Sequence, residues 1–239
     1  SARSFAEGSM QLEVVTIGDE LLLGFTLDTN GAHLARELAQ YGIMVARRTS
    51  VGDGADVIAS AVRDALDRTS AVITTGGLGP TSDDLTKPSI AALFGREMRL
   101  DDAIVESLRQ RWKSRGWPGE LPESNKQQAL IPEGAAILEN RHGSAPGIWL
   151  EDERGRWVAM LPGVPREMRG MFTDALLPRI RRRLNGVPTV VASRTIRTTS
   201  ISESALSDRI RRLTDLDFED LALAYLPGWE GVDLRLTAR

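Results

Sequence analysis

The sequence predicts an α/β protein with a mostly parallel, doubly wound sheet, followed by a small α+β module. Three observations support this fold class. The first third of the chain alternates strand-like and helix-like segments, which is the order of a parallel sheet covered by helices. Two of its strand-like runs, Leu12–Ile17 and Ala71–Thr75, are short and largely apolar, as expected of strands buried on both faces. Residues 187–239 follow another order, with one strand, one helix and two further strands.

The other strand and the two helices of the first third follow from capping residues, glycines and the spacing of apolar residues. A strand is expected at Ile43–Ser50, between the two runs named above. Asp28 or Thr29 can cap the first helix, which Gly42 closes. The second helix covers Val57–Leu66, where apolar residues recur at helical spacing. Two strand–helix–strand crossovers should therefore bring the carboxyl ends of the strands to one edge of the sheet.

The middle of the chain mixes helices with short strands. One helix is expected through Leu93 and another over Asp101–Arg115, followed by a loop at Gly116–Ser124. Pro165 suits the first turn of a further helix, and Pro178 should kink or end it. Short strands are expected at Ala136–Leu138, Gly147–Leu150 and Trp157–Leu161.

The chain divides into two domains and a leader. Asn185-Gly186-Val187-Pro188 is typical of a linker and predicts a main domain at 10–186 and a small module at 187–239. In the module we expect strands at Val190–Thr198, Leu221–Leu226 and Val232–Thr237 and a helix at Glu203–Leu213. Residues 1–9 lack the basic-then-apolar order of a signal peptide. We expect them to be an added leader, with Met10 the natural start.

Composition excludes several kinds of site. The chain has no cysteine, which excludes disulfides, thiol nucleophiles, iron–sulfur clusters and cysteine-type zinc sites. It has only two histidines, so a metal should be bound through oxygen, which favours Mg²⁺ or Mn²⁺. A formal net charge of −3 gives no global field that favours nucleic acid or membrane. No apolar run approaches the roughly 20 residues of a membrane span, and we expect a cytoplasmic protein.

The glycine-rich turn after Thr74-Thr75 is the strongest candidate for a binding site. It reads Gly76-Gly77-Leu78-Gly79-Pro80-Thr81 and leads to the carboxylates Asp83 and Asp84. Glycines allow backbone N–H groups to approach an anion, and threonine hydroxyls add donors. The turn therefore predicts a phosphate site, although it is not a P-loop. A tight strand-to-helix connection is the alternative.

The two aspartates of this turn could have different roles. Together they can hold a hard divalent cation against the phosphates. Asp84 or Thr86 could instead cap the helix that runs through Leu93. Asp83 is then the better candidate for a metal ligand.

Carboxylates also follow the first strand, in Gly18-Asp19-Glu20. They could add ligands to the metal or position water, or they could simply favour a helix N-terminus. Because Gly18 and Gly76 both follow strands of one parallel sheet, their turns should meet at the same edge.

Two later segments could complete the site. The polar cluster Asn125-Lys126-Gln127-Gln128 can bind phosphate or a base, or belong to a solvated helix face. Lys87 and Lys126 are two of only three lysines in the chain. Pro162-Gly163 precedes the helix at Pro165, whose free N–H groups could bind an anion, although ordinary turn chemistry explains it equally well.

Nucleic acid is not an expected partner. The arginine tracts Arg179–Arg183 and Arg209–Arg212 could contact it, but cations late in a helix more often complement the helix dipole. The tryptophans are scattered, without basic residues interleaved between them.

The order of these motifs resembles bacterial CinA, the competence/damage-inducible protein family. The resemblance covers Met10 to Arg239 and rests on Gly18–Gly24, Asp28–Asn30, Val51–Asp53, Thr75–Thr86, Asn125–Leu130, Ala145–Gly147 and Leu161–Glu167. It implies a three-layer α/β/α domain of the molybdopterin-binding (MoaB/MogA) type, followed by a β-α-β-β module similar to a KH domain. The GxxG of that module, Gly228–Gly231, lies between strands rather than helices, so we expect packing or assembly from it and no RNA binding.

The resemblance also implies a function. Such domains are described as pyrophosphatases that hydrolyse ADP-ribose, or a similar nucleoside diphosphate-sugar, to AMP and ribose 5-phosphate. The cofactor would be a divalent metal, Mg²⁺ first and Mn²⁺ or Co²⁺ next. The amidohydrolase domain of many relatives is not expected here. Homo-oligomers are implied, with dimers favoured over trimers.

Roles can be carried over to the matching residues. Glu20, Asp83 and Asp84 are the expected catalytic residues, with Glu20 as general base and Asp83 and Asp84 as metal ligands. Asp53 should reach a sugar hydroxyl. Phosphate and nucleotide binding is expected from Gly18, Asn30, Asp53, Thr75, Gly76, Gly77, Gly79, Thr81, Thr86, Asn125, Lys126, Pro162 and Gly163.

Two other functions stay open at this point. One is nucleotidyl transfer to a pterin, the chemistry of distant relatives with the same glycine turn. The other is a non-catalytic nucleotide-sensing or interaction module linked to competence or DNA damage.

Overall fold

The structure is a computed structural model that describes residues 10–184, 192–213 and 221–238. The chain forms two compact units, of which the second comprises Val187–Arg239 together with the short segment Ala39–Gly42. The expected linker Asn185–Pro188 lies outside the described residues. Each unit is described by itself below.

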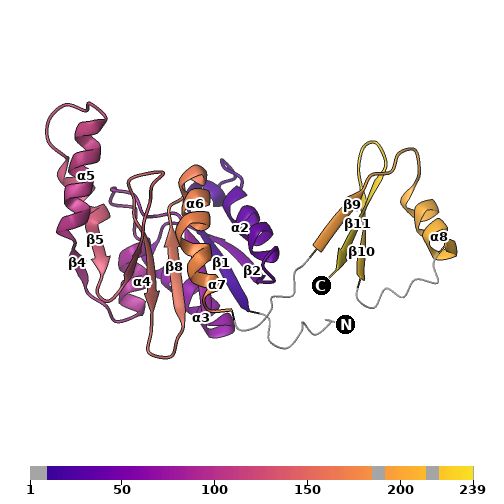
Figure 1. The fold of residues 1–239 in the computed structure, drawn as a ribbon, viewed down its shortest axis with the longest axis horizontal. Coiled ribbons are helices and arrows are strands. Elements are labelled where there is room, and N and C mark those ends of the chain that lie inside the picture. Colours follow the sequence, from indigo (N-terminus) through magenta and orange to yellow (C-terminus); the bar gives the residue numbers. More distant parts are fainter. Residues whose placement is uncertain (1–9, 185–191, 214–220, 239) are drawn as a thin grey trace. The chain divides into compact units, whose positions relative to one another are not determined.

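A six-stranded sheet of order β2-β1-β3-β8-β7-β6 forms the centre of the first unit (Figure 1). Its strands are β1 (Gln11–Ile17), β2 (Met44–Val51), β3 (Ala71–Thr75), β6 (Ala136–Leu138), β7 (Gly147–Glu151) and β8 (Trp157–Leu161). The pairs β1–β2, β1–β3 and β3–β8 are parallel, whereas β7–β8 and β6–β7 are antiparallel. The mostly parallel sheet is therefore confirmed.

The helices follow the predicted order. They are α1 (Asp19–Leu22), α2 (Thr29–Ala39), α3 (Ala55–Thr69), α4 (Thr86–Leu93), α5 (Asp102–Ser114), α6 (Pro165–Met171) and α7 (Leu177–Arg181). α2 and α3 are the crossovers from β1 to β2 and from β2 to β3. Both have an apolar stripe that is buried, as their helical spacing predicted.

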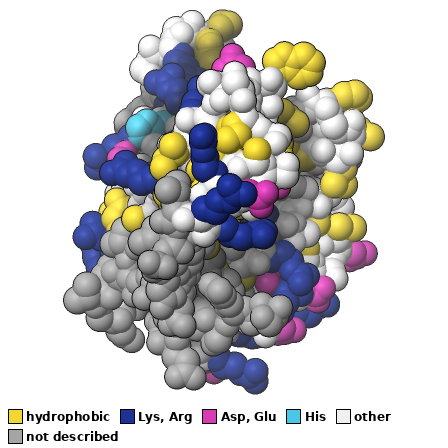
Figure 2. Space-filling model, turned by 90° about the vertical axis from the view of Figure 1, so that its right-hand side faces the viewer, with side chains coloured by type: hydrophobic (Ala, Val, Ile, Leu, Met, Phe, Trp, Pro, Cys, Tyr) yellow, Lys and Arg dark blue, Asp and Glu magenta, His cyan; other side chains and the backbone are white. Residues whose placement is uncertain are grey.

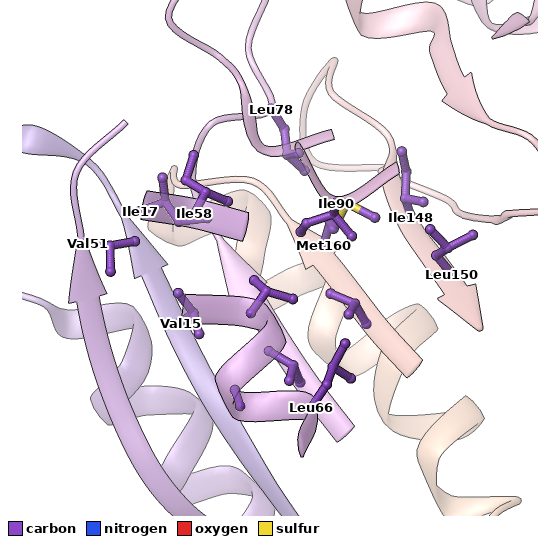
Figure 3. Packing of buried hydrophobic residues seen from close by; sticks show 14 of the residues in the cluster. Val15, Ile17, Val51, Ile58, Leu66, Leu78, Ile90, Ile148, Leu150 and Met160 are labelled. Atoms are coloured by element: carbon purple, nitrogen blue, oxygen red, sulfur yellow. The ribbon is translucent and has the colours of Figure 1, made fainter. Parts of the chain in front are cut away.

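One face of the sheet packs against α3 and α4. Figure 3 shows Val15 and Ile17 of β1 pointing into the same layer as Ile58 of α3, and Met160 of β8 near Ile90 of α4. These side chains are at most 3 % exposed. The core on this side therefore fixes the ends of β1, β3 and β8 relative to α3 and α4.

The opposite face packs against α2 and the α6–α7 segment. Leu34 and Leu38 of α2 and Met168 and Met171 of α6 are fully buried. The ring of His33 in α2 meets Phe172, after α6, edge-on at 6.4 Å between centroids. Helices therefore cover both faces, and the predicted three-layer α/β/α arrangement is confirmed.

Two features of the middle region differ from the sequence prediction. The strands β4 (Met98–Leu100) and β5 (Leu130–Pro132) form a separate antiparallel pair that was not predicted, because three residues are too few to show a period. Pro178 does not end its helix, which continues to Arg181. A π-helical turn at Phe172–Leu176 precedes Pro178. The regular hydrogen-bond pattern is interrupted in this region, where proline lacks the N–H that an α-helix would use.

The second unit has the predicted β-α-β-β order. It comprises β9 (Ala192–Ile196), α8 (Glu203–Leu213), β10 (Leu221–Pro227) and β11 (Val232–Ala238), with an antiparallel sheet of order β10-β11-β9. Leu206 of α8 packs with Val232 and Leu234 of β11. Gly228 and Gly231 lie in the β10–β11 hairpin, joined by an N–H to C=O bond of 2.8 Å, so the GxxG is between strands as expected. In the described part of the chain, no helix has the length and apolar character needed to cross a membrane.

Candidate functional site

A cavity of about 420 Å³ lies where the parallel strands β1, β3 and β8 end. Carboxyl ends of parallel strands at a point where the strand order reverses are the usual ligand site of an open α/β sheet. The residues that line it are Ile17, Gly18, Glu20, Asp53, Gly76, Gly77, Leu78, Gly79, Pro80, Asp83, Asp84, Gln128, Ser144, Ala145, Pro162, Gly163, Val164 and Glu167.

Most of the predicted site residues line this cavity. They are Gly18, Glu20, Asp53, Gly76, Gly77, Gly79, Asp83, Asp84, Pro162 and Gly163. Asn30 and Thr75 line a smaller neighbouring cavity instead. Four predicted residues, Thr81, Thr86, Asn125 and Lys126, line neither. Segments that are far apart in sequence therefore converge on one edge of the sheet.

The glycine turn is closed by backbone and hydroxyl contacts of its own. Gly76 donates its N–H to the Leu161 carbonyl at 3.1 Å, and the Thr86 hydroxyl donates to the Gly76 carbonyl at 2.9 Å. Gly76 has φ +112°, and a Cβ there would stand 2.1 Å from the Ile17 carbonyl oxygen. The turn thus joins the ends of β1, β3 and β8 to the start of α4, and only glycine fits at its first position.

The carboxylate of Asp84 holds the second half of the turn. It accepts the N–H groups of Gly79 at 2.7 Å and Thr81 at 2.9 Å, and also the Thr81 hydroxyl. Asp84 and Thr86 therefore do not cap α4, whose N-cap residue is Leu85. Gly76, Gly79 and Thr81, which were predicted to donate to phosphate, have acceptors inside the protein. The N–H of Gly77 makes no hydrogen bond to the described residues.

Carboxylates of Glu20, Asp53, Asp83, Asp84 and Glu167 also line this cavity. Asp19 and Asp53 exchange hydrogen bonds, with each backbone N–H donating to the other carboxylate at 3.0 and 3.2 Å. Burial raises the pKa of Asp53, and the nearby charges of Asp19, Glu20 and Asp83 raise it further. Of these charges Glu20, Asp53 and Asp83 line the cavity, so the cavity is a favourable place for a cation or for hydrogen-bond donors.

The acidic side chains at this edge lie over glycines. A Cβ on Gly18 would stand 2.5 Å from the Glu20 carboxyl oxygens, one on Gly52 2.4 Å from Asp19, and one on Gly79 2.4 Å from Asp84. Any larger residue would have to displace a carboxylate.

The residues do not form a metal site by themselves. Among the described residues, no group of three or more His, Asp or Glu side chains could hold a metal ion. Both oxygens of Asp84 already accept N–H groups. Glu20, Asp53 and Asp83 remain at the cavity, which fits the way Mg²⁺ binds when one or two carboxylates share it with substrate phosphates.

Of the predicted polar cluster Asn125-Lys126-Gln127-Gln128, only Gln128 lines the main cavity. Its side chain is 3 % exposed, and its Oε1 has no hydrogen-bond partner among the described residues. The buried ammonium of Lys87 fixes this segment, because Nζ donates to the carbonyls of Gln127 at 2.7 Å and Gln128 at 3.1 Å. Burial lowers the pKa of Lys87 to about 8. Lys126, which was predicted to bind the ligand, pairs with Glu123 at 2.6 Å.

The loop between β6 and β7, residues 139–146, closes another side of the cavity with Ser144 and Ala145. Asn140 donates to the Ala145 carbonyl at 2.8 Å and to Glu167 at 2.7 Å. His142 Nε2 lies 2.9 Å from Asp174. Only the Ala145-Pro146-Gly147 motif pointed to this loop in the sequence, because its contacts are long-range.

A small cavity of about 80 Å³ lies beside the main one. Asn30 Nδ2 donates to the Thr75 hydroxyl at 3.0 Å and to the Gly163 carbonyl at 2.7 Å. The Thr75 hydroxyl donates to the Pro162 carbonyl at 2.9 Å. These bonds tie α2, β3 and the turn before α6 together at this edge.

Basic side chains do not gather into one surface on the face drawn in Figure 2. Lys and Arg stand there in separate groups, with Asp and Glu between them.

Comparisons with known proteins identify the family. The model described as "Probable molybdopterin binding domain" matches residues 13–182, and "Damage-inducible protein CinA KH domain" matches residues 193–239. A crystal structure of the protein CinA from Thermoplasma acidophilum, described as of unknown function, is 33 % identical. It has a TM-score of 0.63 and covers 75 % of this chain and 100 % of that chain. The chain belongs to the CinA family.

Longer members of the CinA family are more similar in sequence. The CinA-like protein of Gemmatimonas aurantiaca is 61 % identical over 96 % of this chain and 53 % of its own length. That of Frankia casuarinae is 46 % identical over 96 % of this chain and 54 % of its own length. The chain thus spans about half the length of these relatives. The resemblance seen in the motifs is confirmed, and so is the molybdopterin-binding fold of the first unit.

Proposed function

We propose that this chain hydrolyses the pyrophosphate bond of a nucleoside diphosphate-sugar such as ADP-ribose, giving AMP and ribose 5-phosphate. A divalent cation, Mg²⁺ first and Mn²⁺ or Co²⁺ next, would enter with the substrate. The observation that carries the proposal is the cavity at the strand ends, which is lined by the glycine turn and by the carboxylates of Glu20, Asp53 and Asp83. The glycine turn suits phosphate oxygens, and the carboxylates suit a cation that is bound to those oxygens.

The glycine turn and the carboxylates have separate roles in this proposal. The N–H of Gly77 donates to a phosphate oxygen. The N–H groups of Gly79 and Thr81 can donate to phosphate as well once their hydrogen bonds to Asp84 are broken. Asp83, with Asp53, holds the cation, and Glu20 is left for the water. When bound, the cation neutralises charge on the phosphates and favours ionisation of water.

The chemical step needs only water as the second reactant. The water oxygen forms a bond to one phosphorus, the bond from that phosphorus to the bridging oxygen breaks, and the bridging oxygen leaves with the other phosphate. Glu20 is placed to accept the proton of the water, since it lines the cavity and its carboxyl group lies over Gly18.

Asp83→Asn tests the cation ligand. We expect a loss of metal-dependent AMP release from ADP-ribose of at least about a hundredfold, because an amide is a poor ligand for a hard cation. The fold should be unchanged, since Asp83 is exposed. AMP release is measured by chromatography across Mg²⁺, Mn²⁺ and Co²⁺, with Asp102→Asn, an exposed aspartate in α5, as the matched control.

Turnover of Asp83→Asn close to that of the unmodified protein would contradict this role of Asp83. A screen of ADP-ribose, FAD, NAD and CDP-sugars against the same metals tests the reaction itself. Release of AMP from no adenylate substrate would remove the proposed hydrolysis.

A second candidate function is nucleotide binding without hydrolysis. The absence of a three-residue metal cluster among the described residues and the engagement of Gly79 and Thr81 by Asp84 favour it. It predicts tight binding of ADP-ribose with no turnover in any metal. The match to a molybdopterin-binding domain also keeps nucleotidyl transfer to a pterin as a candidate, which adenylylation of a pterin acceptor would reveal.

We also propose that the chain acts in the cytoplasm as a homo-oligomer, a dimer before a trimer. Light scattering on the purified protein measures the number of subunits.

A further inference from the structure

The small cavity beside the main one has its own polar lining. The two cavities share Ile17, Glu20 and Gly163, so they adjoin along that wall. Asn30 and Thr75 line only the small one. It lies at the N-terminal turn of α2 and the end of β3.

The hydrogen bonds of Asn30 fix which way its amide points. The Pro162 carbonyl can only accept, so the Thr75 hydroxyl donates to it at 2.9 Å and must accept from Asn30 at 3.0 Å. The Gly163 carbonyl, 2.7 Å away, also can only accept. Both contacts therefore come from Nδ2, and the other amide atom is the oxygen.

That oxygen, Asn30 Oδ1, is left without a partner. It is buried and makes no hydrogen bond to any described residue, and Asn30 as a whole is only 8 % exposed. A buried carbonyl without a donor is unfavourable, and such groups in native proteins usually meet water or a ligand. Asn30 lines the small cavity, and we take the cavity as the side from which a donor reaches this atom.

The rest of the lining restricts what this donor can be. Glu20 and Asp28 contribute carboxylates, which disfavour a phosphate. The group must be uncharged or positive, must carry a donor and must reach the wall shared with the main cavity. A sugar hydroxyl attached to a diphosphate satisfies all three conditions.

We propose that the small cavity receives the hydroxyl-bearing edge of a sugar ring, with one hydroxyl donating to Asn30 Oδ1. This inference rests on the proposed function, because the diphosphate in the main cavity brings the sugar to the shared wall. Glu20, which belongs to both cavities, is placed to accept a neighbouring hydroxyl.

Binding of sugar-bearing and sugar-free probes tests this subsite. Calorimetry with Mg²⁺ measures the Kd of ADP-ribose and of inorganic pyrophosphate for the full chain and for Asn30→Ala. We expect ADP-ribose to bind about tenfold more weakly to the variant, with pyrophosphate unchanged, because only the sugar uses Oδ1. Gln110→Ala, which removes an exposed amide on α5, is the matched control.

The opposite pattern overturns the subsite. Equal weakening of both probes, or of neither, would mean that Asn30 only holds Thr75 and Gly163 in place or that Oδ1 keeps a fixed water. If Asn30→Ala does not fold, NMR of the unmodified protein decides. The side-chain amide signals of Asn30 should then shift with ADP-ribose and not with pyrophosphate.

Failure of the subsite and failure of the proposed function give different results. Binding of ADP-ribose that depends on Asn30, without AMP release in any metal, supports the subsite and removes the hydrolysis. Hydrolysis of ADP-ribose with no dependence of binding on Asn30 supports the proposed hydrolysis and removes the subsite. No binding of either probe to the unmodified protein would overturn both.

Discussion

Lys87 lies at the start of α4 with its side chain buried and its ammonium on two backbone carbonyls. Only 3 % of the residue is exposed. Burial lowers its pKa from 10.5 to about 8, while the charge of Asp84 acts in the opposite direction. The carbonyls of Gln127 and Gln128 give it hydrogen bonds but no full negative charge. Lys87 therefore positions Gln128, but burying its charged form lowers the free energy of unfolding by an amount that depends on pH.

The pH dependence of unfolding should reveal this cost. Between pH 8 and 10.5 the folded protein binds fewer protons at Lys87 than the unfolded chain does, so stability rises with pH. Relative to Lys87→Met, the unmodified protein should gain about 2 to 3 kcal/mol of unfolding free energy between pH 7 and 10. Urea unfolding measures the difference. Lys113→Met, at an exposed position in α5, should show no such trend, and parallel curves for Lys87→Met would contradict the prediction.

At the scale of elements, the sequence predicted most helices and strands because their signals are local. Apolar runs marked β1 and β3, and helical spacing marked α3. β4 and β5 were missed because each has three residues and is defined by its partner. At Pro178 the sequence left a kink and a helix end as alternatives. The helix continues past an irregular turn, because burial of Leu177 and Ile180 favours continuation over the local preference of proline.

The glycine turn between β3 and α4 should tolerate no side chain at its first position. Gly76→Ala would place a Cβ 2.1 Å from the Ile17 carbonyl oxygen, at a positive φ. We expect a loss of at least about 2 kcal/mol of unfolding free energy. Gly116→Ala is the matched control, with φ +68° and open space around the new Cβ, and should lose about 1 kcal/mol. Equal losses in urea unfolding would show that contact with Ile17 does not matter.

At the scale of the whole molecule, all residues that line the two cavities belong to the first unit. The edge of the sheet where they meet follows from the order of strands, and the sequence predicted that edge. Which side chains reach the cavity was less predictable. Asp84 accepts hydrogen bonds from Gly79 and Thr81, a contact without a local signature. The polar segment Asn125–Gln128 was recognised in the sequence, but not that Gln128 is its member that lines the cavity.

The first unit should bind its ligand alone. We expect a fragment of residues 10–186 to bind ADP-ribose with a Kd within about threefold of that of the full chain, because none of the described residues of the second unit lines either cavity. Calorimetry on both proteins measures it, with residues 187–239 as the control that should bind nothing. A tenfold weaker Kd for the fragment would place part of the site in the second unit.

The antiparallel direction of β6 and β7 has a consequence for how this site can vary. Because β6 and β7 are antiparallel, the 139–146 loop between them lies at the edge where the parallel strands end. The part of the cavity lined by Ser144 and Ala145 therefore belongs to a hairpin and not to a crossover helix. A hairpin can change in length or composition without shifting the layers beneath it. Grafting this loop from another CinA family member is therefore a direct way to exchange ligand preference while keeping the rest of the scaffold intact.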